Sequence, residues 1–219
     1  MVLRPTTVRP RKTASQARSR ATVGALLEAT ARILVRDGYE RASTNRIAAA
    51  AGVSIGSLYQ YFPGKEALVA AVVERHNRDL MAVIEGAMAE VADAPLEVGV
   101  RRLVAAALEA HAVDPELHRV LAEQTPRAGA LADVELFHRR ACDLFRAYLE
   151  TKRDEIGVDA ELAAFVGVTT VEALTHAAVI HRPEILAHNR EALLEEASRL
   201  VIGYLRGPEA PTRRLRAAV

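Results

Sequence analysis

Residues 44–65, TNRIAAAAGVSIGSLYQYFPGK, constrain the fold of this chain more than any other stretch. Thr44 is a typical helix N-cap, because its hydroxyl can accept a hydrogen bond from an unpaired amide of the first turn. The alanine-rich run over residues 45–51 strongly favours a helix. Gly52 favours a left-handed end to that helix, because glycine adopts positive φ without a Cβ penalty.

A second short helix is expected immediately afterwards, over residues 55–62. Ser54 caps its start, and Pro63-Gly64 ends it. Five apolar residues can close a small core between the two helices: Ile47, Ala51, Val53, Leu58 and Phe62. The opposite side of the second helix is small, polar and aromatic, without acidic groups: Gly56, Ser57, Tyr59, Gln60 and Tyr61. Such a face suits a recognition helix that enters a DNA major groove.

The stretch resembles the helix-turn-helix of the tetracycline-repressor (TetR) family of transcriptional regulators. The matching residues are Thr44, Ile47-Ala48, Ala51-Gly52-Val53-Ser54, Gly56-Ser57-Leu58-Tyr59, Tyr61-Phe62, Lys65-Glu66 and Leu68, with Ala29, Leu34 and Gly38-Tyr39 upstream. The resemblance implies an all-α chain of about nine helices, with an N-terminal three-helix DNA-binding domain and a C-terminal helical domain for ligand binding and dimerisation. It also implies a ligand-responsive repressor that binds a palindromic operator as a dimer.

The resemblance further implies which residues contact double-stranded DNA. The expected contacts are Thr44, Asn45, Ser54, Ile55, Gly56, Ser57, Tyr59, Gln60, Tyr61 and Lys65. Thr44 and Lys65 occupy positions typical of phosphate contacts. Ile55 departs from the polar residue often found at its position, since it can touch a thymine methyl but cannot hydrogen-bond a base.

Charge is distributed unevenly along the chain. Residues 1–65 hold 11 basic and 3 acidic residues, a net charge of +8, whereas residues 66–219 have a net charge of −7. A basic head on an acidic body indicates that only the head meets a polyanion. The expected parts are a disordered basic arm (1–19), a DNA-binding domain (20–66), a regulatory and dimerisation domain (67–206) and a disordered tail (207–219). The arm either tracks phosphates or only adds solubility.

Apolar residues at helical spacing, abundant Ala and Leu, and the absence of Trp predict helices throughout. Caps, glycines and prolines place them at about 20–37, 65–92, 95–112, 115–124, 133–156, 160–181 and 190–206. The most apolar segment, residues 162–180, contains Glu172 and His176. It is therefore expected to be a largely buried helix of a cytoplasmic protein rather than a membrane span.

The last two helices are expected to form a homodimer interface through Phe165, Val171, Leu174, Leu193, Leu200 and Val201. An unknown, largely apolar effector is expected between the fourth, seventh and eighth helices, although each of its candidate residues fits simple core packing equally well. Those residues are Met81, Met88, Phe137, His138, Phe145, Tyr148, Thr169, Thr170, Glu172 and His176.

Two i, i+4 pairs carry further chemistry. His138 with Cys142 could bind one metal ion, but no second ligand pair stands at a typical spacing. Glu172 with His176 could be a satisfied buried hydrogen bond or a polar contact to a small molecule. No nucleophile elbow, HExxH or distinct carboxylate pair is present, so no enzyme activity, metal or cofactor is expected. The alternatives to a regulator are a non-specific nucleic-acid-binding protein and an interaction scaffold.

Overall fold

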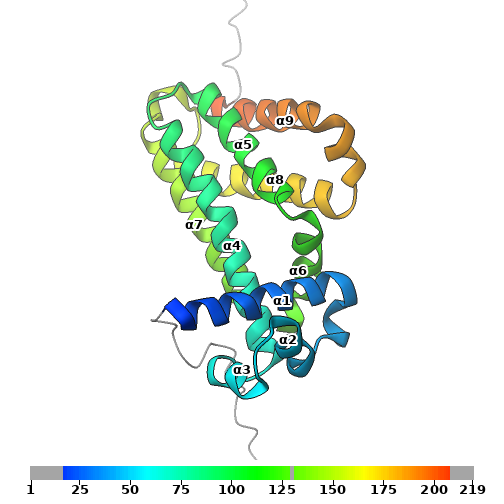
Figure 1. Cartoon of the computed structure of the whole chain (residues 1–219). Helices are drawn as coiled ribbons and strands as arrows, with labels where there is room; N and C mark the ends of the chain where they lie inside the picture. Colours follow the sequence, from blue (N-terminus) through cyan, green and yellow to red (C-terminus); the bar gives the residue numbers. More distant parts are fainter. Residues whose placement is uncertain (1–16, 129–130, 208–219) are drawn as a thin grey trace, which may run out of the picture. The chain divides into compact units, whose positions relative to one another are not determined.

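The computed structural model describes residues 17–128 and 131–207 (Figure 1). Within these ranges the chain forms nine α-helices and one short 3₁₀ helix, which confirms the all-α class. The predicted basic arm and tail lie almost entirely outside them. The helices are α1 (Ala17–Arg41), α2 (Thr44–Ala51), α3 (Ile55–Tyr61), α4 (Lys65–Glu90), α5 (Leu96–Ala112), α6 (Pro115–Ala128), α7 (Leu131–Glu150), α8 (Ala160–Ile180) and α9 (Pro183–Arg206).

Two helices are longer than predicted and contain a break at the residue expected to bound them. In α1, Gly38 has φ 76° and ψ 171°, and the chain resumes helical turns after it, to Arg41. In α9, Asn189 has φ −132° and ψ 25°, but a further helical segment beginning at Pro183 precedes it. Each residue breaks the regular geometry as predicted, although neither separates the helix from its neighbouring turn.

Two other predicted helix ends were wrong. α6 continues past Pro126 to Ala128, because a proline near the end of a helix removes one hydrogen bond without forcing the helix to stop. α7 ends at Glu150 instead of Ile156, and the intervening chain includes a 3₁₀ helix over Arg153–Glu155.

The described chain packs into two compact units, and both are discontinuous in sequence. The head unit comprises residues 17–81 and 111–137, and the body unit comprises residues 82–110 and 138–207. The boundaries between them fall inside the continuous helices α4 and α7 and next to the end of α5. The head unit therefore contains α6 as well as the helix-turn-helix.

One hydrophobic core holds the head unit together. Ile47, Leu58 and Phe62 are buried in it, and Ala51 and Val53 pack against it, which confirms the predicted core between the two short helices. The remaining large members come from α1, α4 and α6: Leu26, Leu27, Ile33, Leu34, Leu68, Val69, Val72, Val73, Leu117, Val120 and Leu121. Helix α6 packs against α1 and so completes the core that supports α3 (Figure 1).

The body unit has a separate core made by α5, α7, α8 and α9. Two glycines admit aromatic rings into it. A Cβ atom at Gly99 would lie 2.6 Å from Cζ of Tyr148, and one at Gly167 would lie 2.9 Å from Cε1 of Phe145. The hydroxyl of Tyr148 is buried and has no hydrogen-bond partner among the described residues. Each ring therefore fits only because the residue opposite it is glycine, which has no side chain.

Helix α8 is long and apolar enough to cross a bilayer by length and composition, and 33% of its most apolar window is buried inside the structure. Its buried residues include Ala163, Ala164 and Gly167, and the helix packs along α9 (Figure 1). The structure therefore buries only part of α8, which is less than the largely buried helix that the sequence predicted.

We expect Gly99→Ala to destabilise the body unit by about 1–3 kcal/mol, because the new methyl group overlaps the Tyr148 ring. Chemical denaturation measures this change. Gly86→Ala in α4 is the matched control, since nothing lies within 4 Å of a Cβ atom there. That variant should gain about 0.5–1 kcal/mol from helix propensity. Equal effects of the two substitutions would contradict the described packing.

Candidate nucleic-acid interface

The first helix of the motif is capped one residue earlier than predicted. Ser43 is the N-cap of α2, and its side chain accepts a hydrogen bond of 3.4 Å from the amide of Arg46. Ser43 and Thr44 are both good capping residues, so residue type alone could not separate them. Thr44 is instead the first helical residue, and its hydroxyl lies 3.1 Å from the hydroxyl of Tyr59 in α3. That hydrogen bond joins two of the predicted DNA contacts.

The turn between α2 and α3 has the predicted geometry. Gly52 is left-handed, with φ 68° and ψ 26°, and its amide donates to the carbonyl groups of Ala48 and Ala49. Ser54 caps α3 by accepting from the amide of Ser57 at 3.1 Å, and the hydroxyls of these two serines are 2.8 Å apart. These bonds hold the first turn of α3, where a recognition helix meets base edges.

The predicted DNA face is solvent-accessible at most of its positions. Its exposed members are Asn45, Ser54, Ile55, Gly56, Tyr59 and Gln60, whereas Thr44 and Ser57 are half-buried. Tyr59 has 43% of its surface exposed, although its hydroxyl is held by Thr44. Because residues 44–61 contain no acidic side chain, nothing on this face repels phosphate.

Tyr61 does not belong to that face. It is only 8% exposed, and its hydroxyl donates to Oγ of Ser19 at the start of α1, at 3.1 Å. The predicted base contact from Tyr61 is therefore incompatible with its position in this structure. Tyr61 follows Leu58 by three residues and so shares its inward side of α3.

Lys65 lies at the start of α4 and anchors that helix to the end of α1. Its Nζ donates to the carbonyl of Tyr39 at 3.1 Å and stands 4.0 Å from the centroid of the Tyr39 ring. An ammonium group has three donors, so this bond leaves capacity for the predicted phosphate contact.

Arg46 is a structural residue of the motif that sequence reasoning missed. It donates to Oδ2 of Asp37 and to the carbonyl of Arg41, both at 2.6 Å, and so ties α2 to the end of α1. Hydrogen bonds from Arg36 and the charges of both arginines lower the pKa of Asp37. Among the described residues, the exposed arginines of the head unit are Arg18, Arg20, Arg32, Arg36, Arg41, Arg46, Arg78 and Arg119. The sequence offered no signal for this structural role beyond the basic side chain of Arg46, because only the fold brings its partners close to it.

The two i, i+4 pairs of the body unit meet across α7 and α8. Nδ1 of His138 lies 2.7 Å from a carboxylate oxygen of Glu172, and Nε2 lies 3.5 Å from the sulfur of Cys142. Burial, followed by the charges of Glu172 and Asp143, raises the pKa of the Cys142 thiol. Burial lowers the pKa of His176. Among the described residues, no group of three or more His, Cys, Asp or Glu side chains is arranged to hold a metal ion. Glu172, His138 and Cys142 are joined in one chain of hydrogen bonds.

The remaining predicted pocket residues occupy several environments. Phe145 and Tyr148 are buried in the body core and Met88 packs against it, whereas Thr169 is exposed and Thr170 half-buried. Met81 and Phe137 belong to the head unit. The exposed position of Thr169 contradicts its predicted role as an anchor inside a cavity, because residue 169 follows the exposed Phe165 by one helical turn.

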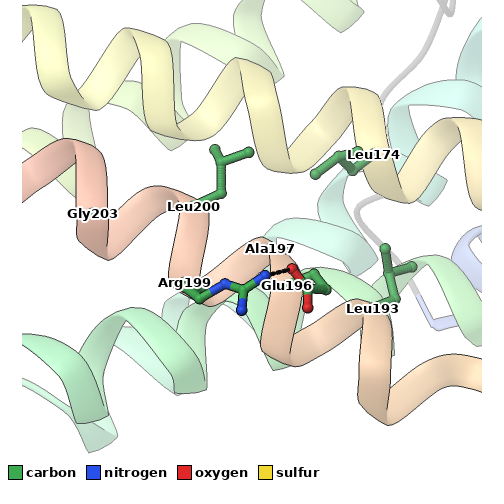
Figure 2. A pocket seen from close by; sticks show the side chains of 7 residues that line it. All are labelled: Leu174, Leu193, Glu196, Ala197, Arg199, Leu200 and Gly203. Atoms are coloured by element: carbon green, nitrogen blue, oxygen red, sulfur yellow. Dashed lines mark hydrogen bonds and ion pairs between the residues drawn. The ribbon is translucent and has the colours of Figure 1, made fainter.

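A groove of about 460 Å³ does lie between α8 and α9 (Figure 2). Its lining is Leu174, Leu193, Glu196, Ala197, Arg199, Leu200 and Gly203, and Arg199 pairs with Glu196 beside it. Figure 2 shows Leu174, Leu193 and Leu200 directed towards the space between the two helices. Three of the six predicted dimer residues thus form this groove.

The other predicted dimer residues differ in exposure. Phe165 and Leu200 are 55% and 52% exposed, although both are large and apolar. Val171 is half-buried. Val201, by contrast, is 2% exposed and belongs to the body core, so it cannot contact another subunit in this conformation. Val201 follows the buried Ala197 by four residues and shares its inward face.

Two family models match this chain. The model described as "Bacterial regulatory proteins, tetR family" matches residues 26–72, and the model "Tetracyclin repressor-like, C-terminal domain" matches residues 95–205. Together they cover the helix-turn-helix and most of α5 to α9. These matches confirm the resemblance inferred from the sequence motif.

Sequence relatives match mainly over the head. The nucleoid occlusion factor SlmA of Actinobacillus pleuropneumoniae is 46% identical over 48 residues, which are 22% of this chain and 24% of that protein. SlmA of Glaesserella parasuis is 32% identical over 85 residues, 39% of this chain and 41% of that protein. The chain thus spans less than half the length of these relatives.

Solved structures match over nearly the whole chain. The fatty acid degradation regulator FadR of Bacillus halodurans has a TM-score of 0.68 and 21% identity, covering 84% of this chain and 96% of that chain. SmeT, the repressor of a Stenotrophomonas maltophilia multidrug efflux pump, has a TM-score of 0.60 and 24% identity, covering 84% and 90%. At these identities the likeness establishes the fold.

Proposed function

Because the chain belongs to the TetR family of bacterial regulatory proteins, we propose that it is a sequence-specific DNA-binding transcriptional repressor rather than an enzyme. The observation that carries the proposal is the exposed face of α3, presented on a buried head core. Ile55 and Tyr59 on this face, together with the exposed Asn45 of α2, offer an apolar group, an aromatic hydroxyl and an amide, which suit base edges and phosphates.

The regulator acts as a homodimer that binds a near-palindromic operator. The support comes from α8, whose exposed stripe is apolar or small over about four turns and contains no charge: Leu162, Phe165, Thr169, Ala173 and Ala177. Small residues let a second helix approach closely, and the adjacent groove offers leucines to its side chains. Two-fold pairing would present two α3 helices to successive major grooves, about 34–36 Å apart.

A small effector controls this binding from the body unit. The unpaired buried hydroxyl of Tyr148 supports the proposal, because it can hydrogen-bond a ligand without losing an existing partner. The His138–Glu172 pair supplies a second polar group within apolar helices. SmeT, which shares this fold, is known as a complex with triclosan, a small aromatic molecule. The repressor and its effector would meet in the cytoplasm, and no membrane partner is proposed.

Selection from random duplex DNA should enrich a near-palindromic motif. Tyr59→Ala should weaken the selected duplex by roughly 1–3 kcal/mol and leave random DNA nearly unaffected, because it removes a base-facing side chain. Lys65→Ala should weaken both duplexes alike and reduce the salt slope by about one. Lys152→Ala in the body unit is the matched control for a lost cation. Enrichment of no motif, with tight binding to every duplex, would instead establish a non-specific DNA-binding protein.

Leu200→Glu should convert the dimer into a monomer, because it places a carboxylate in the apolar groove between α8 and α9. Light scattering at micromolar concentration measures the mass. Leu136→Glu is the matched control, since Leu136 is an equally exposed leucine of the head unit, at 60%. A monomeric parent protein that still binds the selected duplex tightly would refute the dimer.

A compound found by thermal-shift screening of apolar aromatic molecules, triclosan included, should bind the free protein more tightly than the protein–DNA complex. A hundredfold difference corresponds to about 2.8 kcal/mol of coupling, and the duplex must weaken the compound by the same factor. Tyr148→Phe should weaken compounds that hydrogen-bond the hydroxyl, without lowering the stability of the free protein. Calorimetric titration with and without duplex checks both. Equal affinities would exclude that compound as the effector.

A further inference from the structure

Three of the seven histidines meet inside the head unit, although they come from three helices. Nε2 of His76 in α4 lies 2.9 Å from Nδ1 of His118 in α6. The ring of His111, at the end of α5, packs edge-on against His118 with centroids 4.6 Å apart. His111 and His118 are both buried, and His76 is half-buried. We call these three residues the histidine cluster.

The contact between His76 and His118 limits how many protons the cluster can hold. A hydrogen bond between two imidazole nitrogens needs one N–H donor and one bare nitrogen that accepts. One added proton leaves a buried positive charge on the pair, and a second makes both facing nitrogens donors. His111 lies against the same pair and would add a further charge upon protonation. The packed arrangement is therefore best satisfied when the cluster is neutral.

The surroundings of the cluster favour this neutral state. Burial, followed by the charges of His111 and Arg75, lowers the pKa of His76 below its ordinary value. Asp114, in the turn before α6, and Asp79, one turn along α4, oppose that shift without reversing it. Of the charged groups that act on His76, Arg75 and Asp79 come from α4, and Asp114 comes from the turn before α6.

The cluster lies beside the residues through which α6 packs into the head core. In the sequence of α6, His118 lies between Leu117 and Val120. Both of these residues are buried in the core that also contains Ile47 and Leu58 of the helix-turn-helix. Any change that lifts α6 from α4 would therefore open the core behind α3. The hydrogen bond between His76 and His118 is a polar link across this contact.

We propose that the histidine cluster is a proton-sensitive lock, which seats α6 in the head unit when neutral and releases it when the cluster is protonated. The lock concerns the cohesion of the head and stands whether or not the protein represses transcription. A transition metal could replace the shared proton between the two facing nitrogens. However, no group of three or more His, Cys, Asp or Glu side chains among the described residues, the histidine cluster included, is arranged to hold a metal ion. The geometry thus favours a proton over a metal ion.

The sign of the effect follows from the lowered pKa. A histidine whose pKa is lower in the folded state than in the unfolded state binds fewer protons when folded. Its contribution to stability is complete above the ordinary pKa of 6.5 and is lost as the pH falls below that value. Each proton taken up on opening should raise the open fraction about tenfold per pH unit within that window.

Hydrogen exchange of the full chain, read by mass spectrometry at pH 7.5 and pH 5.5 and corrected for intrinsic exchange rates, tests the lock. We expect α6 peptides to lose protection at the lower pH, by up to about tenfold for each proton taken up. His76→Gln and His118→Asn place amides near the bonded nitrogens and cannot take up a proton, so both variants should lose most of this response. His188→Gln, an exposed histidine of α9, is the matched control and should retain it.

Nuclear magnetic resonance titration of the histidine rings in the parent protein provides a measurement that needs no variant. The pKa of His76 should be lower than the ordinary histidine value of 6.5. Unchanged α6 protection between the two pH values, or a full response in both variants, would overturn the lock. So would a response abolished by EDTA, because it would reveal a bound metal ion.

Discussion

Burial of one side of α3 is the constraint on which the function of this fold depends. A helix of seven residues is too short to be stable in water on its own. Leu58 within the helix and Phe62 at its end are almost completely buried. Burial of these two side chains, rather than intrinsic helix propensity, therefore stabilises α3. The outer side then remains available for DNA, because the inner side carries the packing. The Ser54 cap and the bond between Thr44 and Tyr59 refine this position rather than create it.

The local features of the motif could be predicted because each depends on a few neighbouring residues. Gly52 has the expected left-handed conformation, and Ser54 caps α3 as expected. The errors occurred where two neighbouring residues were equivalent by type. Ser43 and Thr44 both suit a cap, and Tyr61 and Tyr59 both suit an aromatic DNA contact. Only their direction relative to Leu58 separates the two tyrosines, since three residues along a helix return to nearly the same side.

Contacts between distant residues could not be predicted from spacing. The partners His76 and His118 are 42 positions apart, and His138 and Glu172 are 34 apart. Sequence analysis identified Glu172 and His138 as members of two separate local pairs, whereas packing of α7 on α8 joins them. The predicted dimer face was partly right for a similar reason. Its leucines could be recognised from the sequence as apolar candidates. Which of two neighbours, Leu200 or Val201, faces the surface depends on the orientation of α9, and the structure exposes Leu200 and buries Val201.

The family models and the packing divide this chain at different places. The C-terminal family model includes residues 95–205, and hence all of α6, whereas packing assigns α6 to the head. A DNA-binding module cut from the chain after residue 72 would lack Leu117, Val120 and Leu121 and expose the surface that they cover. Grafting the operator specificity of this chain onto a relative is therefore not a matter of joining two sequence segments. The graft would have to carry α6 from the distant part of the gene, or recreate its inner side in the recipient.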